Sequence, residues 1–320
     1  MSTAEPLVTA GTLRAVPEKT GQPRPLATSE VDDLLREISS RHGRSFMYDG
    51  ELAGGDGPGA WALTSDEGPA VLKFLPGRNT AVDLEQRGRA LDVLRERGYP
   101  APTLLCCGTV PDGAGPAGTY LVQERLPGAP LGYELTPDQV EEVIRLHALH
   151  ADIGVDLPGE AWPLPVTRPT LEGADGFCVI ETMRAFSAET DALLTELQDM
   201  TRAHERDVAR TGDIVHLDFT FANVLGVDGL VTGVIDWEAA TVGDMGFDLA
   251  TFAFYVFFDD VLRRALLARA AAISGGGALR AYVAHLVFRQ VEWCTRFYDA
   301  DRVRFFIDHS RKVLAELDAL

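Results

Sequence analysis

The chain has 320 residues, 46% of them hydrophobic, which is enough to bury the core of one large domain or two modest ones. A net charge of −19 argues against nucleic acid or an anionic membrane as the main partner, because both bind basic surfaces. The four cysteines show no C-x-x-C spacing, which argues against a zinc site or a disulfide framework. The longest apolar run, residues 249–258, is far shorter than the roughly 20 residues that span a bilayer. We therefore expect a cytoplasmic protein without a membrane partner.

The N-terminal third predicts a flexible tail followed by a small sheet with a helix inserted in it. Residues 1–28 are rich in Pro, Thr and Gly and show no sustained apolar pattern. Apolar residues at helical spacing predict a first helix over 29–43 and a second over 79–97. Short apolar runs separated by turn residues predict strands, which lie within 46–74, 102–110 and 119–126.

The rest of the chain, from residue 127 onward, has a mainly helical pattern. Residues 156–177 are too rich in Pro and Gly to predict regular structure. Residues 212–248 are the strand-like exception. We therefore expect two lobes, residues 29–126 and 127–320.

Residues 212–248 contain a predicted hairpin that brings polar side chains together. The Asp-Gly pair at 228–229, flanked by VLGV and LVTGVID, predicts a two-residue turn. In that register Asn223 lies opposite Val234, and Asp236 follows two residues later. The short loop before Asn223 brings Asp218 to the same open end.

Oxygen ligands of this kind suit Mg²⁺, which prefers one or two carboxylates together with substrate phosphates. Each residue alone also has a plain structural interpretation. Asn223 is compatible with a turn, Asp236 with a helix cap, and His216 with a hydrogen-bonded core imidazole. Their coincidence with the hairpin favours the functional interpretation.

The segment that begins at His216 has the pattern H-x-D-x-x-x-x-N and is followed by a hairpin and I-D-W. This pattern is similar to the catalytic core of aminoglycoside phosphotransferases and choline kinase-like enzymes, which are small-molecule relatives of the protein kinases. GDMGFDLA (243–250) resembles the family's G-D-P-x-x-D-L-A. The resemblance runs through ordered motifs from about residue 46 to 258. It implies an α+β, two-lobed protein-kinase-like fold, with a small antiparallel sheet plus helix and a larger, mainly helical lobe.

The resemblance also implies roles for the residues around the hairpin. Asp218 would accept or orient the substrate hydroxyl. Asn223 and Asp236 would hold Mg²⁺, and Asp248 would tie down the catalytic loop by hydrogen bonds, with His216 as a supporting core imidazole.

The nucleotide side of the site falls in the first half of the chain. AVLKF places Lys73 in the middle of a strand, in a chain with 26 Arg and only three Lys, and the resemblance implies that it pairs with the phosphates of ATP or GTP. The alternative is an edge-strand lysine that prevents aggregation. Glu85 on the next helix is the expected partner of Lys73, with Asp83 as a rival, and either is also compatible with a plain helix surface.

Two further segments complete the predicted nucleotide site. GGDGPG (54–59), with Gly57 and Gly59, is a glycine-rich turn that would cover the phosphates. TYLVQERLPGAPL resembles the hinge strand, so groups around Gln123, Glu124 and Leu126 would contact the base. An ordinary strand end is the alternative.

The sequence departs from the family pattern near the catalytic Asp. Leu217 stands where Gly is usual, Met245 stands where Pro is usual, and residues 219–222 (FTFA) replace a more polar loop. None of these changes removes an expected ligand or the base. They leave the acceptor open.

The predicted function is ATP- or GTP-dependent phosphorylation of a hydroxyl on a small molecule, with an antibiotic as the favoured acceptor and a monomer or homodimer as the state. Acidic residues on the C-terminal helices would suit a polyamine-like antibiotic, although such residues are usually solvated helix surface; they are Asp259, Asp260, Glu292, Asp299 and Asp301. Glu238, two residues past Asp236, would either help to hold the metal or face the substrate. The apolar loop at 219–222 equally suits a less charged acceptor. A metabolic kinase acting on choline, homoserine or methylthioribose would share every motif, and an inactive nucleotide-binding protein is the rival from another class.

Overall fold

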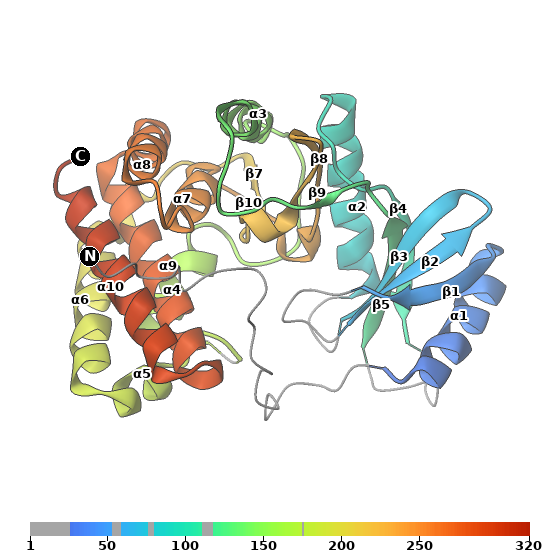
Figure 1. Ribbon diagram of the computed structural model, residues 1–320, viewed down its shortest axis with the longest axis horizontal. Helices are drawn as coiled ribbons and strands as arrows, with labels where there is room; N and C mark the ends of the chain where they lie inside the picture. The colour runs from blue at the N-terminus through green and yellow to red at the C-terminus, as the bar shows by residue number, and fades with distance from the viewer. Residues whose placement is uncertain (1–25, 53–58, 76–79, 111–117, 175) are drawn as a thin grey trace, which may run out of the picture.

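The computed structural model describes residues 26–52, 59–75, 80–110, 118–174 and 176–320, so most of the predicted tail lies outside it. Figure 1 shows the expected two-part architecture, with an antiparallel sheet and two helices at one side and a helical assembly at the other. The predicted α+β, kinase-like arrangement is confirmed.

The N-terminal lobe is a five-stranded antiparallel sheet in the order β1-β2-β3-β5-β4. The strands are β1 (Phe46–Glu51), β2 (Ala60–Ser65), β3 (Gly68–Leu75), β4 (Leu104–Thr109) and β5 (Thr119–Glu124). Two helices accompany them, α1 (Thr28–His42) and α2 (Ala81–Glu96).

The alternation of side chains along β3 decides where its lysine points. Ala70, Leu72 and Phe74 are buried in one apolar cluster with residues of α1. Lys73 therefore projects from the opposite face. On that face Leu121, its neighbour on β5, packs with Leu84 of α2.

The chain leaves β5 and enters the larger lobe through a short strand. β6 (Ala129–Pro130) pairs with β8 (Val224–Val227), which pairs in turn with β9 (Leu230–Val234). A second small sheet joins β7 (Asp213–Val215) to β10 (Thr241–Gly243). These strands carry the segment in which the sequence predicted the catalytic residues.

Helices form most of the larger lobe, and α9 runs through its centre with contacts to α4, α6, α7, α8 and α10. The helices are α3 (Pro137–Ala148), α4 (Leu164–Glu172), α5 (Ile180–Phe186), α6 (Ala188–His204), α7 (Gly246–Phe254), α8 (Asp260–Ser274), α9 (Gly276–Phe297) and α10 (Ala300–Leu317). Helix α4 corrects the prediction that residues 156–177 lack regular structure. Pro163 and Pro165 lie at the start of α4, where proline is tolerated because the first N–H groups need no helical partner.

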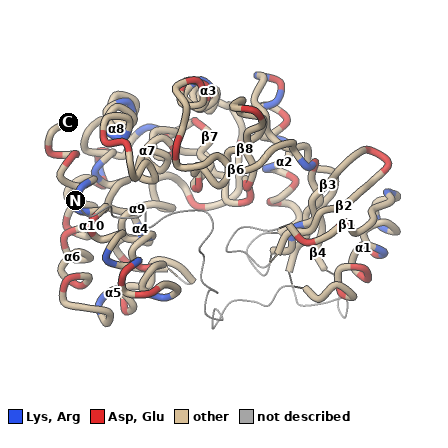
Figure 2. The backbone as a smooth tube through the Cα atoms, in the orientation of Figure 1, with Lys and Arg blue, Asp and Glu red and all other residues tan. Residues whose placement is uncertain are grey.

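Charged residues are spread over both lobes, with Lys and Arg interspersed among Asp and Glu (Figure 2). Arg87 of α2 ties the lobes together, because its Nε donates to the carbonyl of Ala240 at 3.0 Å. Among the described residues, no helix combines the length and apolarity needed to cross a membrane.

Candidate active site

Lys73 reaches across from the N-terminal sheet to two carboxylates of the larger lobe. Its Nζ lies 2.6 Å from Asp236 Oδ1 and 2.8 Å from Glu238 Oε1. The lysine side chain is 14% exposed and that of Glu238 11%, so water screens the second pair only weakly. Residues 163 positions apart in sequence, Lys73 and Asp236, therefore meet between the lobes.

The three charges shift one another's proton affinities. Burial alone would lower the pKa of Lys73, but the neighbouring carboxylates of Glu238 and Asp236 raise it above its ordinary value. Burial would likewise raise the pKa of Asp236, and the Lys73 ammonium holds it below its usual range instead. Burial, together with the charge of Asp236, raises the pKa of Glu238 to about 7 against the pull of Lys73. Two acids thus share a single cation.

Glu85 does not hold the position expected for it. It is exposed on α2, and among the described residues the ion pairs of Lys73 go to Asp236 and Glu238. Asp83, the rival candidate, is used in capping α2, where it accepts from the backbone N–H of Thr80 at 2.8 Å. Glu238, for which the sequence left a metal-binding and a substrate-facing role open, is the second carboxylate that partners the lysine and is largely buried.

Of the glycine-rich segment, the structure describes Gly59, which directly precedes the strand residue opposite Lys73. Gly57 lies outside the described residues. Gly59 has a φ of +124°, and a Cβ there would lie 2.8 Å from Trp61 Cζ2, so glycine is required. Its successor Ala60 is the cross-strand partner of Lys73.

The predicted hinge lies at the end of β5. Gln123 is buried and Glu124 is exposed, with its Oε2 accepting from Thr103 Oγ1 at 2.9 Å. Leu126 packs on Gly233 of β9, where an added Cβ would lie 2.7 Å from Leu126 Cδ1. The hinge therefore runs onto the hairpin that carries Asp236. Beside it, a cavity of about 30 Å³ adjoins Gln123 and Glu238, which is room for about one water molecule.

Asp248 and His216 hold the loop that the sequence predicts to be catalytic. Asp248 Oδ2 accepts from the backbone N–H of His216 at 2.7 Å, and its Oδ1 accepts from that of Leu217 at 3.0 Å. His216 Nε2 lies 2.7 Å from the carbonyl of Ile235, so this nitrogen donates, and Nδ1 accepts from the N–H of Asp218 at 3.3 Å. Both side chains are buried. Their contacts are those of the supporting roles expected for them.

The carboxylate of Asp218 is about half exposed and has a partner on each oxygen. Asn223 Nδ2 donates to Oδ2 at 3.0 Å and to the Asp218 carbonyl at 2.8 Å. Arg289 Nη2 lies 3.2 Å from Oδ1. This arrangement fixes the plane of the carboxylate while leaving it open to solvent.

The hairpin differs from its predicted register by one residue. Asp228 and Gly229 both have positive φ, 50° and 84°, as the two-residue primed turn requires. A bulge at Thr232 then shifts the pairing, so Asn223 is hydrogen-bonded to Ile235, whose N–H donates to its carbonyl at 2.9 Å, rather than lying opposite Val234. Asp236 consequently follows directly after the partner of Asn223.

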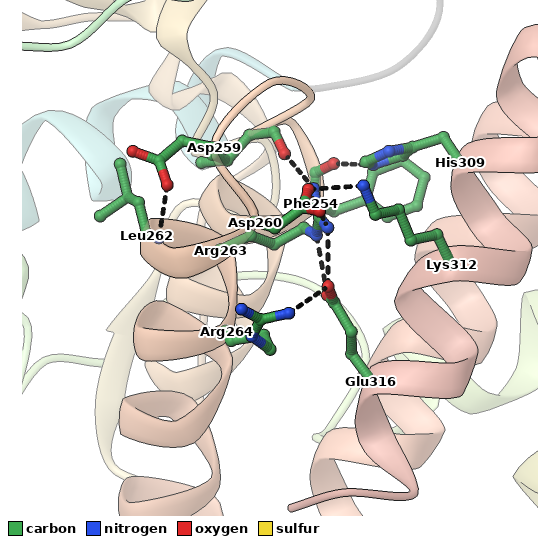
Figure 3. A network of polar contacts seen from close by, with 10 residues as sticks. Phe254, Asp259, Asp260, Leu262, Arg263, Arg264, His309, Lys312 and Glu316 are labelled. Atoms are coloured by element: carbon green, nitrogen blue, oxygen red, sulfur yellow. Dashed lines mark hydrogen bonds and ion pairs between the residues drawn. The ribbon is translucent and has the colours of Figure 1, made fainter.

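Two of the remaining acidic residues assigned to substrate, Asp259 and Asp260, have partners within the protein (Figure 3). Asp259 caps α8 by accepting from the N–H of Leu262 at 2.9 Å. Asp260 Oδ1 lies 2.8 Å from Arg263 Nη2 and 2.5 Å from Lys312 Nζ.

Glu292 is fully buried, with its Oε1 2.5 Å from Arg296 Nε. The predicted acidic wall facing a cationic substrate is therefore not formed by Asp259, Asp260 and Glu292, because capping and ion pairs employ their charges.

The sequence interpretation missed Arg289. Nothing local distinguishes it among 26 arginines, because its partners lie 71 and 72 positions away in the sequence. The one indirect signal was Leu217, a side chain at a position where the family pattern has glycine.

The model of the family described as "Phosphotransferase enzyme family" matches residues 51–282, well over half of the chain. The chain belongs to this family. It is therefore a small-molecule phosphotransferase, and a site that joins a strand lysine to an Asp-Asn loop and a second Asp agrees with that membership. A search of curated proteins by sequence finds no match for this phosphotransferase.

Solved structures share the fold of this phosphotransferase at low sequence identity. A thermostable mutant of aminoglycoside phosphotransferase APH(4)-Ia, in ternary complex with ADP and hygromycin B, is similar with a TM-score of 0.62 at 17% identity, over 90% of this chain and 97% of that one. A microcompartment-associated aminopropanol kinase is similar with a TM-score of 0.64 at 16% identity, over 88% and 95%. The choline kinase LicA from Streptococcus pneumoniae is similar with a TM-score of 0.59 at 13% identity, over 92% and 100%.

Proposed function

We propose that the protein transfers the terminal phosphoryl group of ATP or GTP to a hydroxyl of a small molecule. One observation carries this proposal: Lys73 of the N-terminal sheet meets Asp236 and Glu238 between the lobes, next to the loop that presents Asp218. A cation for phosphates and a half-exposed carboxylate for a hydroxyl are the parts that phosphoryl transfer needs, since its catalysis is mainly positioning and charge stabilisation.

Each side chain has a definite task in this proposal. The ammonium of Lys73, oriented by the carboxylates beside it, pairs with phosphate oxygens of the nucleotide. Asp218 accepts a hydrogen bond from the acceptor hydroxyl and takes its proton as the phosphoryl group is transferred. Main-chain groups from Glu124 to Leu126 contact the base, and the turn at Gly59 lies against the phosphates.

The donor set also fits Mg²⁺. Asn223 and Asp236 offer amide and carboxylate oxygens, and Glu238 adds a second carboxylate, which leaves more negative charge than Lys73 neutralises. Asn223 and Asp236 would hold the ion, with Glu238 beside them. When bound, Mg²⁺ would offset the charge of the phosphates.

We propose an antibiotic as the acceptor. The internal pairing of Asp259, Asp260 and Glu292 favours a less cationic compound over a polyamine-like one. A metabolic hydroxyl is the second candidate, since the fold matches an aminopropanol kinase and a choline kinase as well as an antibiotic kinase. A cytoplasmic location and a monomeric or homodimeric state stay predictions.

The test is release of ADP or GDP against a panel of antibiotics and metabolites, including hygromycin B, a macrolide, a nucleoside, choline, aminopropanol and homoserine. We expect Asp218→Ala to lower turnover by about 10²-fold or more, the range expected for loss of a general base. Asp236→Ala should also abolish turnover, and both variants should keep the wild-type melting temperature within a few degrees.

Asp228→Asn is the matched control, because it changes an Asp of the same hairpin and keeps the turn chemistry. Turnover by Asp218→Ala at the wild-type rate would refute the assignment. Tight nucleotide binding without turnover of any acceptor would favour the inactive nucleotide-binding alternative.

A further inference from the structure

Arg289 of α9 contacts two consecutive residues of the catalytic loop. Its Nη1 donates to the carbonyl of Leu217 at 2.8 Å, and its Nη2 donates to Asp218 Oδ1 at 3.2 Å. The side chain is 22% exposed, and the hydroxyl oxygen of Tyr255 accepts a further hydrogen bond from the guanidinium. Tyr255 is itself held by Gln290, to which its hydroxyl donates at 2.6 Å. The guanidinium is therefore fixed by packing and hydrogen bonds.

The conformation of Leu217 explains why such a contact is needed. Leu217 has a φ of +68°, the left-handed region, which crowds the Cβ of any residue except glycine. Asp248 holds its N–H, and Arg289 holds its carbonyl. A strained residue of this kind persists only where its surroundings hold it in place.

The direction of the Asp218 side chain depends on the same contact. Asn223 Nδ2 holds Oδ2, and Arg289 Nη2 holds Oδ1. The backbone before Asp218 and one oxygen of its carboxylate are thus attached to a single side chain. That side chain comes from the central helix of the lobe.

We propose that Arg289 is a positioning residue that keeps Leu217 in the left-handed conformation and thereby aims the carboxylate of Asp218 at the acceptor hydroxyl. The inference rests on the proposed function for what Asp218 does. The effect of Arg289 on the loop itself is independent of that function.

The central experiment compares Arg289→Gln, Leu217→Gly and the double variant. Arg289→Gln should lower kcat by roughly 10- to 100-fold, because misplacing a reacting group by about 1 Å costs up to this much, and KM for nucleotide and acceptor should change less than about twofold. Leu217→Gly alone is the reference for the double variant, because Arg289 still holds the loop in it. In the double variant glycine adopts the conformation without strain, so at least about a third of the lost kcat, on a logarithmic scale, should return.

Hydrogen exchange of peptides covering residues 216–223 provides a readout that needs no acceptor. We expect Arg289→Gln to speed exchange in these peptides and the double variant to remain closer to wild type. Arg280→Gln is the matched control, since it removes an arginine of the same helix whose partners, Asp318 and the Leu317 carbonyl, lie at the end of α10. It should alter neither kcat nor loop exchange.

Three results would overturn the proposal: unchanged loop exchange in Arg289→Gln, a raised acceptor KM at constant kcat, or no recovery in the double variant. The second result would make Arg289 an acceptor-binding residue. If Arg289→Gln fails to fold, Arg289→Lys replaces it, because lysine keeps the charge but lacks the planar fork that bonds both residues. Absence of turnover in the wild type would refute the proposed function, while hydrogen exchange would still decide the role of Arg289.

Discussion

Glu238 is the partner of Lys73, a role for which the resemblance to kinases predicted Glu85 of the N-terminal lobe. It is buried and shares the ammonium of Lys73 with Asp236. Asp236, the other carboxylate that contacts Lys73, lies two residues earlier in the same segment. The lysine is therefore oriented by carboxylates of the larger lobe.

This arrangement predicts a difference between two Glu→Gln variants. Glu238→Gln should lower kcat/KM for the nucleotide by about tenfold or more, because a hydrogen bond to a charged group contributes about 1.5–3 kcal/mol. Glu85→Gln removes an exposed carboxylate of α2 and should stay within about twofold of wild type. Steady-state kinetics with varied ATP measures both values. Equal losses in the two variants would restore Glu85 as the partner of Lys73.

Among single residues, the sequence predicted those whose positions depend on a few neighbouring residues. Lys73 on its strand and the Asp228-Gly229 turn follow from alternation and turn chemistry within a few residues. The Glu238–Lys73 pair does not, since it joins positions 165 apart whose approach depends on how the lobes pack. Arg289 escaped prediction for the same reason.

At the scale of elements, a buried ion-pair network joins α8 to α10 (Figure 3). Arg263 is fully buried, and its Nε and Nη2 donate to the two oxygens of Glu316 at 2.8 and 2.7 Å. A third donor, Nη1, bonds the carbonyl of Val256 at 2.8 Å. The network thereby links the end of α10, the last helix of the larger lobe, to the loop that follows α7.

Truncating one partner of this network should destabilise the fold. Glu316→Ala removes two hydrogen bonds from the buried Arg263 guanidinium and leaves Asp260 as its remaining carboxylate partner, so the free energy of unfolding should fall by about 1.5–3 kcal/mol. Arg264→Ala removes a half-exposed arginine 3.9 Å from the same carboxylate and should change it by less than about 1 kcal/mol. Urea unfolding measures both. A loss below 1 kcal/mol in Glu316→Ala would show that the pair is solvated in solution.

Among the helices and strands, the sequence predicted the hairpin but missed its bulge and helix α4. The hairpin was expected, but the bulge at Thr232 was not, because an extra residue in one strand leaves the turn signal unchanged. Helix α4 was missed because prolines usually interrupt helices, and here two lie in its first turn while Pro169 is inside it. Packing of Val166 and Thr170 into the lobe outweighs that local preference.

At the scale of the whole molecule, three buried histidines make stability depend on pH. Burial lowers the pKa of His147 to about 4, of His285 to about 3 and of His309 to about 4. Below pH 6.5 the unfolded chain binds protons that the native protein does not. Stability from these groups is therefore full above pH 6.5 and is lost as the pH falls toward 4, by up to about 1.4 kcal/mol per pH unit for each histidine.

The variant His309→Gln tests this dependence, because glutamine does not titrate and keeps a donor for the carbonyl of Phe254, which His309 Nε2 contacts at 2.6 Å. Urea unfolding at pH 7.5 and 5 should show a smaller loss in the variant than in the wild type. His204→Gln, at a partly exposed site beside Asp207, is the control for the substitution itself. An unchanged slope in His309→Gln would show that this histidine is accessible to protons in the native state.

The pairing of Lys73 also has a practical consequence for covalent labelling. Between residues 26 and 320 the chain has two lysines, and Lys312 is half exposed on α10. Amine-reactive reagents attack only the unprotonated amine, and the two carboxylates around Lys73 keep it as an ammonium. General acylating reagents should therefore modify Lys312 and spare Lys73. At the proposed nucleotide site, a reagent carrying a nucleotide would place its reactive group beside Lys73, so modification of the tryptic peptide that contains Lys73 would report whether a compound occupies that site.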